Sequence, residues 1–304
     1  MKQGKYIQFL GTGGGDYHAP GSVNEAAYKD DPKYMEALRL GGKNIRSSAS
    51  LFIAPDIIVD FGEGARARLQ EYGIPERAVR HLLITHGHYD HFFPAAIFPF
   101  AAALDHPLRV YGNTMIRDAI AFAQTYRWDN TRKRHILNSR PVTNLRVKTV
   151  VLEKPFRLSS LRVTPVLAAH FINRQMDKEY TILEQQALNY IIERDGKTLF
   201  YGLDCSYTLP KTLEFMARYR FDIMILDASY CDLAVDPTGT GHHNYAMLAE
   251  DLAEYRGANM IKPETILVYS HLSTSTMVPE HEVAAERLAK QGITLAYDGL
   301  TLNF

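Results

Sequence analysis

Three histidines and one aspartate lie within six positions of one another in the segment LLITHGHYDHFFP, residues 82–94. One residue separates His86 from His88, and Asp90 is followed directly by His91. A sharply bent loop can aim these two pairs at two neighbouring centres, and imidazole nitrogens with carboxylate oxygens suit zinc and its first-row neighbours. The spacing therefore predicts a metal-binding loop rather than ordinary surface or core histidines.

Further candidate ligands close apolar segments later in the chain. His170 ends LRVTPVLAAH, Asp204 ends TLFYGLD, and His271 ends TILVYSH. His242 and His243 lie together in GTGHHNYA, just before a helical pattern. Each of these residues alone is more often structural than functional. Together with the first cluster they supply what a two-metal site needs, namely several ligands per ion and a carboxylate able to bridge ions about 3.5–4 Å apart.

The elements that must position these residues alternate between strand and helix patterns. Strand-like runs are found at residues 6–10, 50–54, 57–61, 81–85, 108–112, 221–229 and 265–271. Helix-like patterns cover 63–73, 113–127 and 244–257, and residues 187–204 form a predicted hairpin turning at Asp195-Gly196. This order predicts a layered α/β fold with two sheets inside and helices outside. No repeat or linker divides the chain, so we expect a single domain over residues 1–304.

Composition limits the partners. The 304 residues carry 34 basic and 34 acidic side chains, so no global field attracts nucleic acid or an anionic membrane, although a local patch is compatible with this balance. The first residues lack a signal-like apolar stretch, and the most apolar segment, 92–104, is too short to span a bilayer. Two cysteines, Cys205 and Cys231, exclude a disulfide framework and a four-cysteine zinc site. We expect a cytoplasmic protein with neither a membrane nor a nucleic-acid partner.

With these residues in place, the chain resembles the metallo-β-lactamase superfamily of dinuclear hydrolases. The metal motifs that carry the resemblance are His86-Gly-His88-Tyr-Asp90-His91, His170, Asp204 and His271. Three further segments resemble its phosphodiesterase branch, which contains the cyclic phosphodiesterase of bacterial phosphonate breakdown and the RNase Z-like enzymes: FLGTGGG (9–15), RSSASLFIAPDIIVDFGEG (46–64) and the segment from GHHNYA onward. The resemblance implies a four-layer αββα fold in which helices flank two facing sheets.

The resemblance also implies a role for each ligand. One divalent ion would be held by His86, His88 and His170, the second by Asp90, His91 and His271, and Asp204 would bridge the two. Zinc or manganese is implied, with iron as a further option, because nitrogen and oxygen ligands alone do not select one metal. Asp60, in VDFGEG, would support the metal loop from behind. The alternative for this carboxylate is a cap on the helix that follows it.

The implied reaction is hydrolysis of small phosphodiesters, cyclic ones among them, by a metal-bridging hydroxide. Asp90 and Asp204 would act at the reaction centre, and His242 would contact the phosphate and protonate the leaving group. His243 competes for that role, since a sequence does not show which ring turns inward. The alternatives are a lactone or thioester hydrolase on the same site and, further off, a tRNA 3′-end endonuclease.

Two polar inserts and several histidines fall outside this scheme. The insert at 16–44 replaces the cysteine-rich structural zinc site of the phosphonate-pathway enzyme and could cover the site. The insert at 125–135 carries four basic residues and the only tryptophan. A solvated loop or a homodimer contact is preferred there to an anion- or base-binding lip. We expect structural roles for Cys205 and for the remaining histidines, which are His18, His81, His106, His135 and His281.

Overall fold

The computed structural model describes residues 4–15, 29–171, 186–236, 241–273 and 280–304. Two seven-stranded sheets form the centre of this described part. The first sheet has the order β16 (Thr301–Asn303), β1 (Tyr6–Gly11), β2 (Ser50–Ile53), β3 (Ile57–Val59), β4 (His81–Leu83), β5 (Leu108–Gly112) and β8 (Leu145–Thr149). The second has the order β15 (Ile293–Leu295), β14 (Ile261–Ser270), β13 (Phe221–Asp227), β12 (Lys197–Gly202), β11 (Gln186–Arg194), β10 (Leu161–Phe171) and β9 (Phe156–Leu158).

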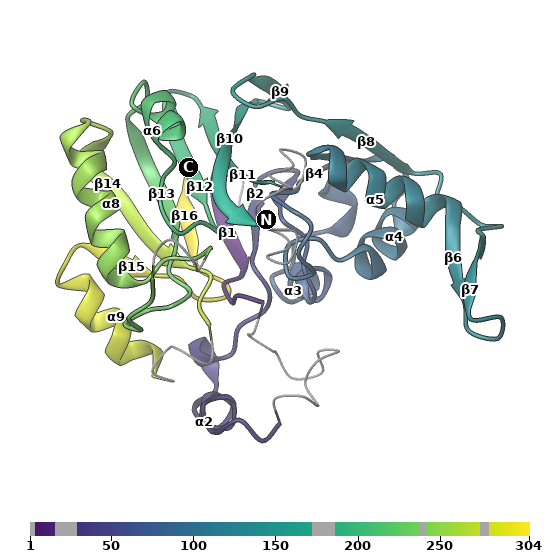
Figure 1. The fold of residues 1–304 in the computed structure, drawn as a ribbon, viewed down its shortest axis with the longest axis horizontal. Coiled ribbons are helices and arrows are strands. Elements are labelled where there is room, and N and C mark those ends of the chain that lie inside the picture. Colours follow the sequence, from purple (N-terminus) through teal and green to yellow (C-terminus); the bar gives the residue numbers. More distant parts are fainter. Residues whose placement is uncertain (1–3, 16–28, 172–185, 237–240, 274–279) are drawn as a thin grey trace.

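Helices cover the outer faces of both sheets, as Figure 1 shows. The helices on the first sheet are α3 (Ala65–Glu71), α4 (Pro94–Ala103) and α5 (Thr114–Thr125), and those on the second are α6 (Pro210–Met216), α8 (Tyr245–Gly257) and α9 (His281–Ala289). A further helix, α2 (Pro32–Leu40), lies apart from these layers. The predicted αββα arrangement is therefore confirmed.

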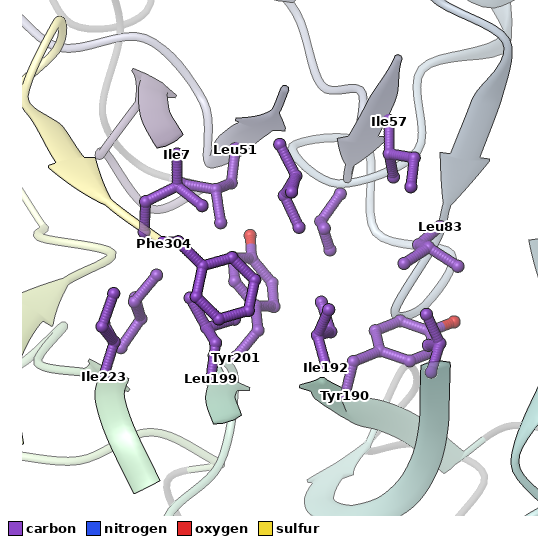
Figure 2. Close-up of a cluster of buried hydrophobic side chains, with 14 of the residues drawn as sticks. Ile7, Leu51, Ile57, Leu83, Tyr190, Ile192, Leu199, Tyr201, Ile223 and Phe304 are labelled. Carbon is purple, nitrogen blue, oxygen red and sulfur yellow. The ribbon is translucent and has the colours of Figure 1, made fainter. Parts of the chain in front are cut away.

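Three large apolar clusters of described residues hold the layers together. The central one packs the inner faces of the two sheets against each other, with Ile7, Leu51 and Leu83 facing Tyr190 and Leu199 (Figure 2). The other two clusters fill the spaces between each sheet and its own helices. Strands buried on both faces need apolar residues on both, which is why β3 is a continuous apolar run and β4 has two consecutive leucines rather than an alternating pattern.

The two predicted inserts contain regular structure. The stretch 125–135, for which a solvated loop or a homodimer contact was preferred, belongs to a hairpin of β6 (Tyr126–Asp129) and β7 (Arg134–Leu137), so the prediction of a loop was wrong. Asp129 explains the turn, because its side chain accepts hydrogen bonds from the backbone N–H groups of Thr131 and Arg132. In the first insert, α2 begins after a capping aspartate, Asp31. Residues 16–28 of that insert lie outside the described residues.

Helix α4 lies wholly within the apolar segment 92–104. Pro94 occupies the first turn, where its missing N–H costs no helical hydrogen bond, while Pro99 lies inside the helix. Within the described residues, every helix is too short or too polar to cross a membrane.

Candidate metal centre

The loop after β4 carries the first four predicted ligands, and Asp60 fixes its shape from behind. The Asp60 carboxylate accepts hydrogen bonds from the backbone N–H and the hydroxyl of Thr85 and from the hydroxyl of Tyr201. It also lies 2.7 Å from Nδ1 of His91. Helix α3 begins only at Ala65, with Gly64 as its N-cap, so Asp60 supports the loop and does not cap the helix.

The remaining predicted ligands come from the ends of neighbouring strands. Asp204 follows β12 and His271 follows β14, on either side of β13, and these three strands are parallel. Their carboxyl ends therefore meet at one edge of the sheet. His170 reaches the same place from the end of β10. Asp60, Asp204 and His271 all have φ values between 54° and 61°, a left-handed conformation that non-glycine residues adopt at a cost of about 1–3 kcal/mol each.

All seven predicted ligands converge into two adjoining groups. In one group the ligand atoms of His86, His88, His170 and Asp204 lie within 4.8 Å of one another. In the other, Asp90, His91 and His271 do the same. The first group offers three imidazoles and a carboxylate, and the second offers two imidazoles and a carboxylate.

Asp204 lies between the groups and turns one oxygen toward each. Its Oδ2 is 3.6 Å from Nε2 of His86 and 3.6 Å from Nε2 of His170. Its Oδ1 is 3.0 Å from Nε2 of His91 and 3.1 Å from Nε2 of His271. A carboxylate shared in this way has the geometry of a bridging ligand between two ions.

The ligand atoms are better placed to bind divalent cations than to hydrogen-bond with one another. His86 Nε2 and Asp204 Oδ1 are fully buried with no hydrogen-bond partner among the described residues. Nitrogen also faces nitrogen at short range, with Nε2 of His91 at 3.0 Å from Nε2 of His271. Unsatisfied buried acceptors are costly, and a cation between these atoms would satisfy them. The residues present therefore fit a pair of metal ions.

The charges of the site act on each other through a water-poor interior. Burial disfavours charge on His91, but Asp204 and Asp90 outweigh it and raise the pKa of His91 well above its usual value. Burial opposes ionisation of Asp204 in the same way, yet His271 and His91 hold the pKa of Asp204 well below its usual value. Asp204 thus stays ionised, which is the form that binds a cation.

The glycine-rich turn after β1 lies directly against the ligands. A methyl group at Gly14 would come 3.2 Å from Cε1 of His271, and one at Gly15 would come 3.2 Å from Oδ2 of Asp90. At Gly62 it would lie only 1.9 Å from the carbonyl oxygen of Asp90. Glycine is therefore needed where the backbone packs closely against the metal loop.

His242 lies beside the two groups, and an aspartate holds it there. Its Nδ1 is 2.7 Å from Oδ2 of Asp227 and 3.9 Å from Oδ2 of Asp204. Its ring stacks on that of His271, with centroids 5.3 Å apart. Burial lowers the pKa of His242, but the ion pair with Asp227 more than compensates and raises it above the usual value. The side chain is 21% exposed, so one edge of the ring faces solvent.

Asp227 joins several parts of the site. Its Oδ1 accepts hydrogen bonds from the backbone N–H and the hydroxyl of Ser229, and that hydroxyl is 2.7 Å from Nδ1 of His271. Its Oδ2 accepts the backbone N–H of Cys205, the residue after the bridging aspartate, at 3.2 Å. The buried Asp227 carboxylate therefore orients His242 directly and His271 through Ser229. It also holds the backbone next to Asp204.

His243 turns to the opposite side. It is buried, and its Nε2 lies 3.3 Å from Asp251 of α8 while its Nδ1 lies 3.6 Å from the sulfur of Cys205. Burial raises the pKa of the Cys205 thiol, so this cysteine is a packing residue rather than a reactive thiolate.

The other described histidines lie in four places. His81 is buried in β4, His106 lies against the carbonyl oxygen of Arg77, and His281 lies 2.8 Å from the guanidinium of Arg46. His135 is part of the exposed hairpin. His18 lies outside the described residues.

Sequence reasoning missed Asp227 and Ser229. The signal was present, because Asp227 ends the apolar strand segment FDIMILD in the same way that Asp204 ends TLFYGLD. A carboxylate at the end of a buried strand is rare without a partner, and here the partner is His242.

An αββα sandwich that gathers histidines and aspartates at its strand ends defines a metal-dependent hydrolase. The chain matches the Beta-lactamase superfamily domain over residues 56–286 and belongs to that superfamily. This confirms the family inferred from the metal motifs and the assignment of the chain as an enzyme.

Solved structures with the same fold cover nearly the whole chain. Zn²⁺-bound PqqB from Methylobacterium extorquens has a TM-score of 0.68 and 17% identity, covering 98% of this chain and 100% of its own. A diphosphatase of the PhnP family has a TM-score of 0.64 and 18% identity, covering 98% and 96%. The short form of human tRNase Z has a TM-score of 0.61 and 18% identity, covering 98% of both chains. No curated protein sequence matches the chain.

Proposed function

We propose that the chain hydrolyses small phosphodiesters, cyclic ones among them, with two divalent cations, zinc or manganese, at the metal centre. The observation that carries this proposal is the pair formed by His242 and Asp227 beside the two ligand groups. A phosphodiester with an alkoxide leaving group needs a proton at the departing oxygen, whereas a thiolate leaves without one. A histidine held ready to donate a proton therefore favours a substrate with an alkoxide leaving group, such as a phosphodiester, over a thioester.

The chain's own residues divide the work as follows. Because Asp227 accepts from Nδ1 of His242, the opposite ring nitrogen, Nε2, is the one that would donate a proton to the substrate. The protonated ring donates from Nε2 to the leaving oxygen and stays protonated at Nδ1, which Asp227 stabilises. Cations held by the two ligand groups would act as Lewis acids on the phosphoryl oxygens and would lower the pKa of a water molecule. Asp90 and Asp204 contribute the carboxylates that keep those cations in place.

A substrate panel tests the proposal. The protein is reconstituted with zinc and, separately, with manganese, its metal content is measured, and cyclic and linear phosphodiesters are compared with phosphomonoesters, lactones and thioesters. We expect diesters to be the preferred substrates at about two ions per chain. Efficient cleavage of lactones or thioesters without cleavage of bis-(p-nitrophenyl) phosphate would assign the same centre to acyl substrates instead.

A further inference from the structure

The hairpin of β6 and β7 exposes several large hydrophobic side chains. Trp128 is 50% exposed and Leu137 is 71% exposed, although both are large hydrophobic residues. Phe122, at the end of α5, extends the surface, with its ring 5.2 Å from Tyr126 and 5.0 Å from His135. An exposed cluster of this kind marks an interaction site rather than random exposure.

The hairpin stands well away from the metal centre. The first turn of α5 touches the metal loop, where a methyl group at Gly87 would lie 2.6 Å from Met115. The twelve residues of α5 then span about 18 Å before the hairpin begins. Figure 1 shows the hairpin at the edge of the molecule, beyond the end of α5. The exposed surface therefore lies far from the metal ligands.

The pairing of the two strands separates apolar from charged side chains. Tyr126 pairs with Leu137 and Trp128 with His135, so these four share one face. Arg127, Asp129 and Arg134 share the opposite face with Ile136, and Arg132 and Lys133 lie in the turn. The hairpin thus has four cations and one carboxylate, in a chain whose total charge is zero. The hairpin is therefore a local basic patch, which is compatible with the balanced total charge of the chain.

In contrast to the expectation of no membrane partner drawn from the total charge, we propose that this hairpin docks on an anionic lipid bilayer, with the aromatic face in the headgroup region and the cations on its other face and turn drawn to the lipid phosphates. Elements that lie in a membrane interface have this pattern, with tryptophan, tyrosine and leucine on one face and arginine or lysine on the other. The surface potential of anionic lipids attracts such a basic segment.

Two other occupants fit the surface less well. Single-stranded nucleic acid stacks its bases on aromatic rings that alternate with cations along one groove, whereas here the strand cations lie on the face opposite the rings. A second copy of the chain would need a larger surface. Four residues per strand give a face of about 14 Å by about 10 Å, far below the roughly 800 Å² per partner of a stable interface.

The tryptophan of the hairpin supplies the test, because Trp128 is the only one in the chain and its fluorescence reports on this surface alone. The metal-loaded full-length protein is mixed with vesicles of phosphatidylcholine, with or without phosphatidylserine. We expect a blue shift and co-sedimentation with phosphatidylserine vesicles at low salt, and at least about tenfold weaker binding in 0.5 M salt or to neutral vesicles.

Matched variants separate the two faces. Leu137→Glu should abolish the blue shift, and the double variant Arg127→Glu/Arg134→Glu should weaken binding by about 30-fold or more. Val283→Glu, at a valine that is 54% exposed on α9, is the control and should bind as wild type does. All four proteins should hydrolyse a soluble diester equally well.

Three results would overturn the proposal. The first is the absence of any shift with phosphatidylserine vesicles. The second is a shift produced by protein concentration alone, which would indicate self-association. The third is a shift with single-stranded oligonucleotides but not with vesicles.

Discussion

Replacing Asp227 by asparagine removes the charge that holds His242 while keeping the shape of the side chain. Oδ2 of Asp227 now accepts from Nδ1 of His242 at 2.7 Å and from the backbone N–H of Cys205 at 3.2 Å, and Oδ1 accepts from the backbone N–H of Ser229 at 2.9 Å. An amide has one oxygen, so in either orientation its NH₂ group faces at least one of these backbone donors. The lost hydrogen bond should cost about 1–3 kcal/mol of stability.

The effect on catalysis should be larger and selective. Without the carboxylate, the pKa of His242 falls and its Nδ1 is no longer fixed as the protonated nitrogen. We expect kcat for diesters with alkoxide leaving groups to drop by about 10²–10⁴-fold, the usual range for a general acid. Diesters with nitrophenol leaving groups, which need little protonation, should lose much less.

The control is the neighbouring pair, in which Asp251 contacts His243 at 3.3 Å on the far side of the turn. Asp251→Asn makes the same chemical change beside a histidine that does not face the ligands, and we expect its kcat to be near that of wild type. Steady-state kinetics with both kinds of leaving group, alongside elemental analysis, measure the difference. Equal losses for the two kinds of leaving group in Asp227→Asn, or loss of metal, would refute the reasoning.

Three further changes probe other parts of the site and fold. Asp204→Ala should lower the metal content of both ligand groups and abolish activity, because one carboxylate faces both; elemental analysis that still finds two tightly held ions would contradict a bridging role. Gly62→Ala should weaken metal binding by tenfold or more, since the new methyl group would meet the Asp90 backbone at 1.9 Å, whereas Gly257→Ala, with nothing within 4 Å, should be tolerated. Burial and Arg46 lower the pKa of His281 to about 4, so the unfolded chain gains a proton there before the folded one, and the free energy of unfolding should fall by up to about 3 kcal/mol between pH 6.5 and pH 4. Urea titrations in chelator should show a smaller fall for His281→Asn, and parallel curves would rule out this contribution.

The parts of the fold that could be predicted are those whose signal is local. Buried strands such as β3 and β4 are short apolar runs, and the hairpin turn at Asp195-Gly196 has a recognisable sequence with φ values of 51° and 82°. The helix α4 was read only as an apolar stretch, because two prolines argue against a helix unless one occupies the first turn.

The features that the sequence did not predict depend on long-range contacts. Neighbouring histidines in an irregular segment carry no sign of their direction, and here Asp227 of β13 and Asp251 of α8 set it for His242 and His243. The hairpin at 126–137 was missed because each strand has only four residues and most of them are exposed, so neither strand carries a buried apolar run.

The most direct test of the proposed function compares leaving groups in the wild type and in His242→Ala. The measurement is kcat for a series of phosphodiesters whose leaving groups span a wide range of pKa, with metal content checked for each protein. We expect a shallow dependence on leaving-group pKa in the wild type and a steep one in His242→Ala, with the two converging at nitrophenol and the metal content unchanged. Parallel dependences in the two proteins would contradict the assignment of His242 as the proton donor.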